Sequence, residues 1–265
     1  MSTRSEYRRD DLAQLEQEKA KGRFFRDIGH NIRHMPRQMR RIGVVQFFSW
    51  FAFFAMWSMA TPALTEHVFK APAPQAGAYD MAVPAEAAAF AADNKAFQDA
   101  ADLVGVAMGW YGLSSMVVAL LLAFYAARFV LNRRLVHGTA LVVGGVGFLG
   151  MYAVESLWLL KLCFVGVGVA WASILSMPYA LLAGCLEEKR MGVFMGLFNM
   201  FIVLPQITAA LGLGPVVREA FGNHAIYALM LSGASLLLAA AFVIRVRENP
   251  ALEPIPEPGG RALRG

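Results

Sequence analysis

The sequence predicts an all-α, polytopic membrane protein whose six transmembrane helices pack as one bundle. Uncharged apolar stretches lie at 42–65, 103–127, 138–154, 162–186, 191–213 and 225–244. A bilayer core about 30 Å thick requires about 20 helical residues, and four of the stretches exceed that length. The composition agrees, because 57% of the 265 residues are hydrophobic and the mean hydropathy is +0.48.

Basic residues divide unequally between the two sides of this bundle. If the first 41 residues are cytoplasmic, 20 of the 24 Lys and Arg residues lie on the cytoplasmic side. The four on the outer side are Lys70, Lys95, Lys161 and Arg218. The positive-inside rule therefore predicts a multi-pass protein of the inner (cytoplasmic) membrane with both termini in the cytoplasm. The bases are split between loops rather than gathered on one face, which argues against nucleic-acid binding despite the net charge of +5.

The chain divides into three parts. Residues 1–41 predict a cytoplasmic amphipathic linker for the inner lipid headgroups, with a solvated linker helix as the alternative. Residues 42–246 form the transmembrane bundle, with one long outside loop at 67–102 and a short helix near 86–101 within it. The Pro- and Gly-rich residues 247–265 predict a disordered cytoplasmic tail.

The first stretch carries a stripe of polar and aromatic residues. Gln46, Trp50, Trp57 and Thr61 follow one another at spacings of four, seven and four, which places them on one face of an α-helix. Indole faces beside amide and hydroxyl groups are typical of sugar sites, since the rings stack on C–H groups and the polar atoms bind hydroxyls. A Trp-rich helix that simply packs against its neighbours explains the spacing equally well.

The fourth and fifth stretches combine an internal proline with polar residues. Pro178 and Pro205 each remove a backbone hydrogen bond, which a membrane tolerates only against protein or a water-lined cavity. We interpret the polar residues beside them as cavity-lining, with interhelical hydrogen bonding as the alternative. They are Trp171, Ser173, Ser176, Tyr179, Asn199 and Gln206.

Small residues predict helix packing. Gly105/Gly109 and Gly192/Gly196 have the spacing at which two membrane helices approach closely. The third and sixth stretches are mostly Gly, Ala, Leu and Val, so two lining helices are followed by one packing helix, twice. This order is typical of a three-plus-three repeat around a cavity.

Ionisable residues are missing from the middle of every stretch. Ion relays require buried ionisable groups, so we expect no ion-coupling centre in this chain. Ser114 lies in a nucleophile-like context, but we expect no membrane-embedded histidine to activate it. The same lack of ligands argues against a metal site, so we expect neither an enzyme nor a cofactor. Cys163 and Cys185 are interpreted as packing residues.

Three segments resemble bacterial sugar transporters of the major facilitator superfamily, in the glycoside–pentoside–hexuronide:cation symporter and sucrose-transporter-like branch. VQFFSWFAF at 45–53 resembles the seventh helix of these transporters, and GVAWASILSMPYA at 168–180 resembles the tenth. MGVFMGLFN at 191–199, with VLPQ at 203–206, resembles the eleventh. The basic loop at 128–134 departs from the superfamily's loop motif, because it lacks its Gly and Asp.

The resemblance implies that this chain is the C-terminal six-helix half of the major facilitator fold, with 1–41 connecting it to an N-terminal half. It implies transport of a sugar, such as the disaccharides maltose or sucrose, by alternating access. A coupling cation, with a proton favoured, would be bound mainly by the N-terminal half. The residues expected to line the sugar site are Gln46, Trp50, Trp57, Tyr111, Trp171, Ser176, Asn199 and Gln206.

Two other functions fit a six-span chain. A stand-alone membrane scaffold would bury its polar faces in a partner and keep them dry. A half-sized carrier that acts as a homodimer would wet these faces, and it would need a self-complementary surface.

Overall fold

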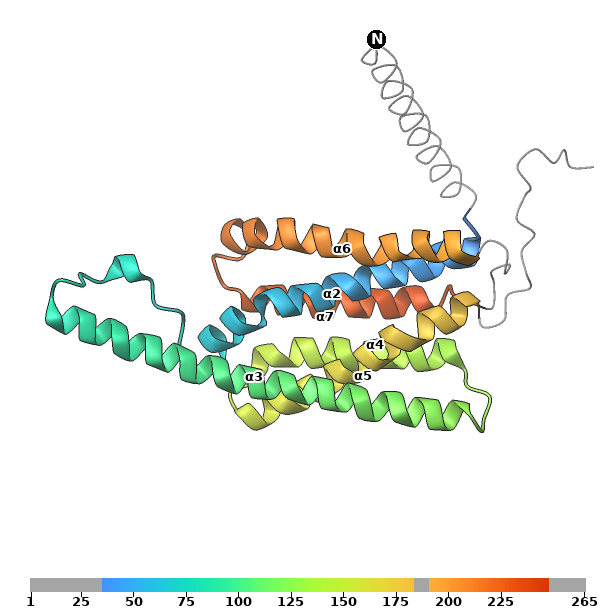
Figure 1. Ribbon diagram of the computed structural model, residues 1–265, viewed down its shortest axis with the longest axis horizontal. Coiled ribbons are helices and arrows are strands. Elements are labelled where there is room, and N and C mark those ends of the chain that lie inside the picture. The colour runs from blue at the N-terminus through green and yellow to red at the C-terminus, as the bar shows by residue number, and fades with distance from the viewer. Residues whose placement is uncertain (1–34, 184–190, 248–265) are drawn as a thin grey trace, which may run out of the picture.

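The computed structural model describes residues 35–183 and 191–247, which form a bundle of long helices (Figure 1). The helices are α2 (Arg37–His67), α3 (Pro84–Ala126), α4 (Arg133–Gly150), α5 (Leu157–Ala183), α6 (Met191–Glu219) and α7 (Ile226–Val243). Two short 3-10 turns, η1 (Ala76–Ala78) and η2 (Met151–Ala153), lie in the connections, and no strand occurs in the described ranges. Each of the six helices is long and apolar enough to cross a membrane. The prediction of an all-α chain with six candidate membrane spans is confirmed.

The helices pack in an order that leaves α3 and α6 at opposite edges (Figure 1). α2 lies against α6 and α7, α7 against α4, α4 against α5, and α5 against α3. In the most apolar 18-residue part of each helix, 11% of the residues are buried in α3 and 22% in α6, against 44–50% in the other four helices. The two edge helices therefore have large surfaces that the described part of the chain does not cover.

Glycines bring α4 and α5 close to their neighbours. A Cβ atom on Gly147 of α4 would lie 2.7 Å from the carbonyl oxygen of Cys163 in α5. A Cβ atom on Gly145 would lie 3.1 Å from a carbonyl oxygen of α7, and one on Gly168 of α5 would collide with the carbonyl oxygen of Tyr111 in α3. Lipid provides little hydrophobic driving force between helices, so such close backbone approach supplies much of the packing energy.

The glycine pairs singled out by their spacing do not pack in this way. A Cβ atom on Gly105, Gly109, Gly192 or Gly196 would have no neighbour within 4 Å among the described residues. The described part of the chain therefore packs no helix on these pairs, and the close approach that their spacing predicts stays a prediction. The reason is that both pairs lie on the outward faces of the edge helices α3 and α6.

The segment at 67–102, predicted as the outside loop, is more helical than predicted. α3 runs from this segment into the candidate membrane span without a break, so the short helix expected near 86–101 is its N-terminal part. The ring of Tyr79 packs on Phe90 with 5.4 Å between centroids, and its hydroxyl donates a 2.7 Å hydrogen bond to the Asp93 carboxylate. This hydrogen bond raises the pKa of the Tyr79 hydroxyl. The loop before α3 is thus attached to the projecting helix.

α4 begins at Arg133 rather than at 138. The side chain of Asn132 caps the helix by accepting a 2.8 Å hydrogen bond from the backbone amide of Leu135. Long arginine side chains in a first turn can extend to the headgroup region while their stems lie against apolar surface. The helix consequently includes His137, which the hydropathy pattern placed just before the span.

Some predictions concern parts of the chain outside the described residues. The amphipathic linker predicted at 1–41 is described only from Met35, and the tail predicted at 247–265 only at Arg247. Cys185 also lies outside the described residues. The linker and the tail remain predictions.

The glycine contacts lead to a stability prediction. Gly168→Ala should lower the free energy of unfolding of the bundle by about 1–3 kcal/mol, because the added methyl group meets backbone that cannot move aside. Gly109→Ala is the matched control, since it adds the same methyl group to an open helix face. Circular dichroism of the purified full chain during heating measures both. Equal stability of the two variants would contradict the packing described.

Candidate functional site

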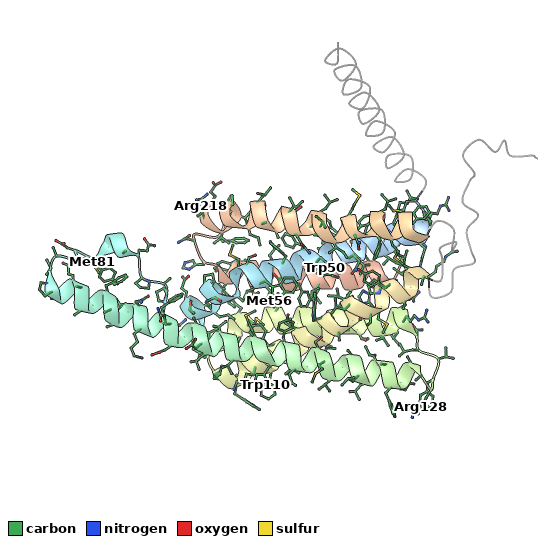
Figure 2. All side chains as sticks on the ribbon, in the orientation of Figure 1. Trp50, Met56, Met81, Trp110, Arg128 and Arg218 are labelled. Atoms are coloured by element: carbon green, nitrogen blue, oxygen red, sulfur yellow. The ribbon has the colours of Figure 1, made fainter. Side chains whose placement is uncertain are left out.

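Aromatic rings from α2, α3 and α5 form one cluster midway along the bundle, where Trp50 is labelled in Figure 2. The ring centroid of Trp171 lies 5.4 Å from that of Trp50, 5.2 Å from Trp57 and 4.8 Å from Phe53. Tyr111 approaches Phe53 at 6.5 Å. Four of the eight predicted site residues are therefore brought together around Phe53, a residue that the sequence analysis missed.

The cluster is buried on one side and exposed on the other. Phe53 is fully buried and contacts Phe148 of α4 with 5.9 Å between ring centroids. Trp57 is 39% exposed, whereas Trp50 and Trp171 are partly buried. α4 thus supports the cluster from behind, and part of its indole surface remains accessible.

Trp50 of this cluster and Gln46, one turn before it in α2, carry polar atoms without partners. Gln46 is fully buried, and neither its amide nitrogen nor its amide oxygen has a hydrogen-bond partner among the described residues. The indole nitrogen of Trp50, one turn further along α2, is buried and unpartnered in the same way. Buried polar groups are normally paired, and each unpaired one costs about 1–3 kcal/mol. The two side chains therefore hold donors and an acceptor that no described residue uses.

The other predicted residues lie apart from the aromatic cluster. The hydroxyl of Ser176 donates a 2.8 Å hydrogen bond to the carbonyl oxygen of Ala172 within α5. Asn199 and Gln206 lie on α6, which packs mainly on α2. Asn199 is exposed, and Gln206 is half-buried. The predicted site is thus divided between a central aromatic part and separate polar positions.

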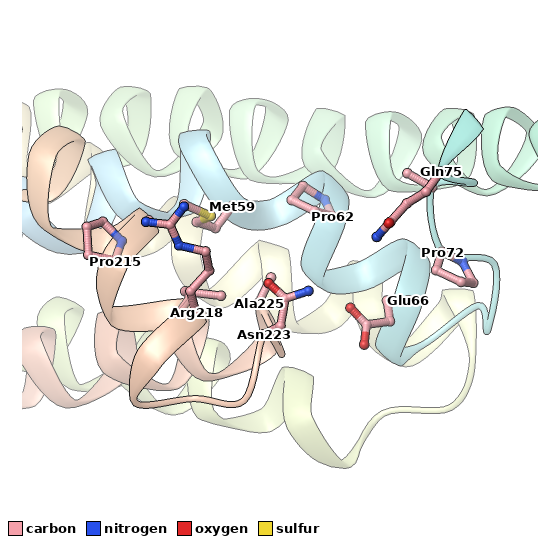
Figure 3. Close-up of a pocket in the computed structure, with 12 residues that line it drawn as sticks. Met59, Pro62, Glu66, Pro72, Gln75, Pro215, Arg218, Asn223 and Ala225 are labelled. Carbon is pink, nitrogen blue, oxygen red and sulfur yellow. The ribbon is translucent and has the colours of Figure 1, made fainter. Parts of the chain in front are cut away.

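The bundle also has an open cavity of about 690 Å³ at the C-terminal ends of α2 and α6 (Figure 3). Glu66 of α2 and Arg218 of α6 both line it. The Glu66 carboxylate is 2.9 Å from the ring nitrogen of His224, which ties the end of α2 to the loop before α7. None of the eight predicted residues lines this cavity.

His137 is a buried ionisable residue that the sequence analysis placed outside the span. It is 2% exposed, and its Nδ1 atom lies 2.8 Å from the hydroxyl oxygen of Ser173 in α5. Its Nε2 atom has no partner among the described residues. The sequence analysis missed this buried histidine, which lies near the start of α4 rather than in the middle of a span. Ser114 is not its partner, because the Ser114 hydroxyl donates to the carbonyl oxygen of Val165 at 2.7 Å.

Comparisons with known proteins find no match to this chain. No family model matches the chain, and neither a curated protein nor a solved structure matches it. The fold and the site define a class, an α-helical protein with six candidate membrane spans around a central aromatic and polar cluster. A function must be argued from these residues.

The unpaired amide of Gln46 leads to a second stability prediction. Gln46→Leu should raise the stability of the bundle by about 1–3 kcal/mol, because it removes buried polar atoms that have no partner. Gln38→Leu is the matched control, since the Gln38 side chain makes two hydrogen bonds to the backbone of Arg247 and its loss should destabilise. Thermal unfolding of both variants measures the two effects. If Gln46→Leu destabilises the bundle as much as Gln38→Leu, the Gln46 amide has a hydrogen-bond partner and the description is wrong.

Proposed function

We propose that the chain is one six-helix bundle of a sugar carrier of the major facilitator type. The observation that carries the proposal is the cluster of Trp50, Trp57 and Trp171 beside the unpaired amide of Gln46. Indole faces stack on the apolar faces of sugar rings, and buried donors and acceptors fix the hydroxyl groups. A bound sugar would supply the hydrogen bonds that Gln46 and the Trp50 indole lack. The choice of a disaccharide such as maltose or sucrose comes from the sequence resemblance.

The exposed edge helices support a second bundle as partner. α3 and α6 flank α2 at the two edges, and their outward glycines leave smooth surfaces on which other helices can pack closely. In the proposal an N-terminal six-helix half covers this side, and the two halves rock around a sugar held between them. The coupling cation, with a proton favoured, binds mainly in that half.

The orientation in the membrane belongs to the proposal as well. Arginines gather at the end of the bundle where α2 and α4 begin and where α3 and α7 end, as Arg128 shows in Figure 2. Arg218 lies at the opposite end. In the proposal the arginine-rich end faces the cytoplasm, as the positive-inside rule favours, both termini are cytoplasmic, and the carrier lies in a bacterial inner membrane.

Replacing one indole tests the site. Trp171→Ala, introduced into the gene at its own locus, should lower the uptake of labelled maltose or sucrose by about two- to tenfold, because an aromatic stacking face contributes about 0.5–1.5 kcal/mol beyond its buried area. The matched control is Trp158→Ala, which removes an indole that is 63% exposed near the start of α5.

Membrane blots must show equal amounts of both variants. Uptake that is unchanged in Trp171→Ala, or equally lowered in Trp158→Ala, would contradict the sugar site. The blot also reports the size of the native protein. A native protein near 28.9 kDa would show that the chain carries no N-terminal half of its own. Its partner bundle would then be a second copy or a separate chain.

A further inference from the structure

A second built site lies at the arginine-rich end of the bundle, away from the aromatic cluster. A cavity of about 340 Å³ opens where α2 begins and α7 ends. This volume falls within the range of small-molecule sites. Four of its six lining residues are arginines, and the full set is Arg37, Arg40, Arg41, Val44, Phe242 and Arg245.

The positive charge of this cavity has no counter-charge in the part of the chain that the structure describes. No carboxylate lines the cavity there, and none of its four arginines belongs to an ion pair of the described ranges. Arg37, Arg40 and Arg245 are exposed, and Arg41 is half-buried. Like charges held this close repel one another, so an anion bound between them would be stabilised by all four.

The two helix ends that carry the arginines are fixed to each other. The buried side chain of Gln38 donates a 2.7 Å hydrogen bond to the carbonyl oxygen of Arg247 and accepts a 3.1 Å one from its backbone amide. The ring of Phe48 in α2 stacks on Phe242 of α7 with centroids 5.7 Å apart. The guanidinium group of Arg245 lies over the ring of Phe242, 5.2 Å from its centroid. The two helix ends that carry the arginines are therefore held next to each other.

The apolar walls favour an amphiphilic anion over a free one. Val44 and Phe242 belong to the apolar parts of their helices, so the cavity joins the charged zone to the hydrocarbon boundary. A second groove of about 640 Å³ runs between α4 and α7 beside the same end of α7, and its lining is almost entirely apolar, including Val142 and Leu237. Basic pockets of this kind between membrane helices bind lipid headgroups.

We propose that the arginine cavity binds the phosphodiester headgroup of an anionic phospholipid. The phosphate oxygens accept hydrogen bonds from guanidinium groups of both α2 and α7, and the acyl chains lie along the apolar surface of α7. The bound lipid thereby joins the first and last helices of the bundle. This site does not depend on the proposed sugar transport, and either can fail without the other.

Titration with phosphatidylglycerol tests the site. The full chain, purified in micelles with phosphatidylcholine, should retain one phosphatidylglycerol in native mass spectrometry. Arg40→Gln with Arg245→Gln should weaken this binding about thirtyfold, because each arginine near an anionic headgroup contributes about a factor of five. Arg128→Gln with Arg247→Gln is the matched control, since it removes two positive charges from the same end but outside the cavity. The control should bind like the unchanged chain.

Three results would overturn the proposal. The first is equal weakening in both double variants, which would indicate only a general attraction to anionic surfaces. The second is displacement of the lipid by an equal concentration of inorganic phosphate, which would indicate a site for a free anion. The third is unchanged binding in a correctly folded Arg40→Gln/Arg245→Gln variant. If that variant loses its helical circular dichroism, Arg245→Gln alone, at an exposed position after α7, should still bind about fivefold more weakly.

Discussion

The architecture depends on close backbone approach between helices that have little hydrophobic reason to associate in lipid. Gly147 and Gly145 place α4 directly against α5 and α7, and Gly168 places α5 against α3. Helices α2, α4, α5 and α7 are about equally buried and form the centre of the bundle, and α3 and α6 remain its edges. The same constraint explains why the uncovered glycines of α3 and α6 suit contact with further helices.

Helix α4 supports the aromatic cluster. Phe53 is held against Phe148 of α4, and Trp50, Trp57 and Trp171 are arranged around it. The unpaired amide of Gln46 and the indole nitrogen of Trp50 are a cost in stability that packing alone does not explain. Such a cost is typical of binding sites, where residues are selected for their ligand rather than for the stability of the empty protein.

The fold was largely predictable, because the length of an apolar stretch and the placement of arginines follow directly from bilayer physics. Helical spacing on one helix also identified Trp50 and Trp57. It could not identify Phe53, since an apolar ring in an apolar helix carries no signal until a neighbouring helix is placed against it. The Gly105 and Gly192 pairs show a related limit: spacing shows that a helix has a smooth face, but not what covers it. His137 was missed because hydropathy excludes the polar first turn of a span.

The central claim is that the predicted polar and aromatic residues of α2, α3, α5 and α6 line a water-filled sugar path. Thiol labelling in intact membranes tests this claim most directly. In a chain freed of its native cysteines, Ser176→Cys and Asn199→Cys should react with a charged aqueous reagent, and sugar should slow the reaction. Leu211→Cys on α6, at a position 75% exposed, should stay unreactive, because we expect this apolar side chain to face lipid. If Ser176→Cys and Asn199→Cys are as unreactive as Leu211→Cys, the polar positions are dry and the chain is not a carrier of this kind.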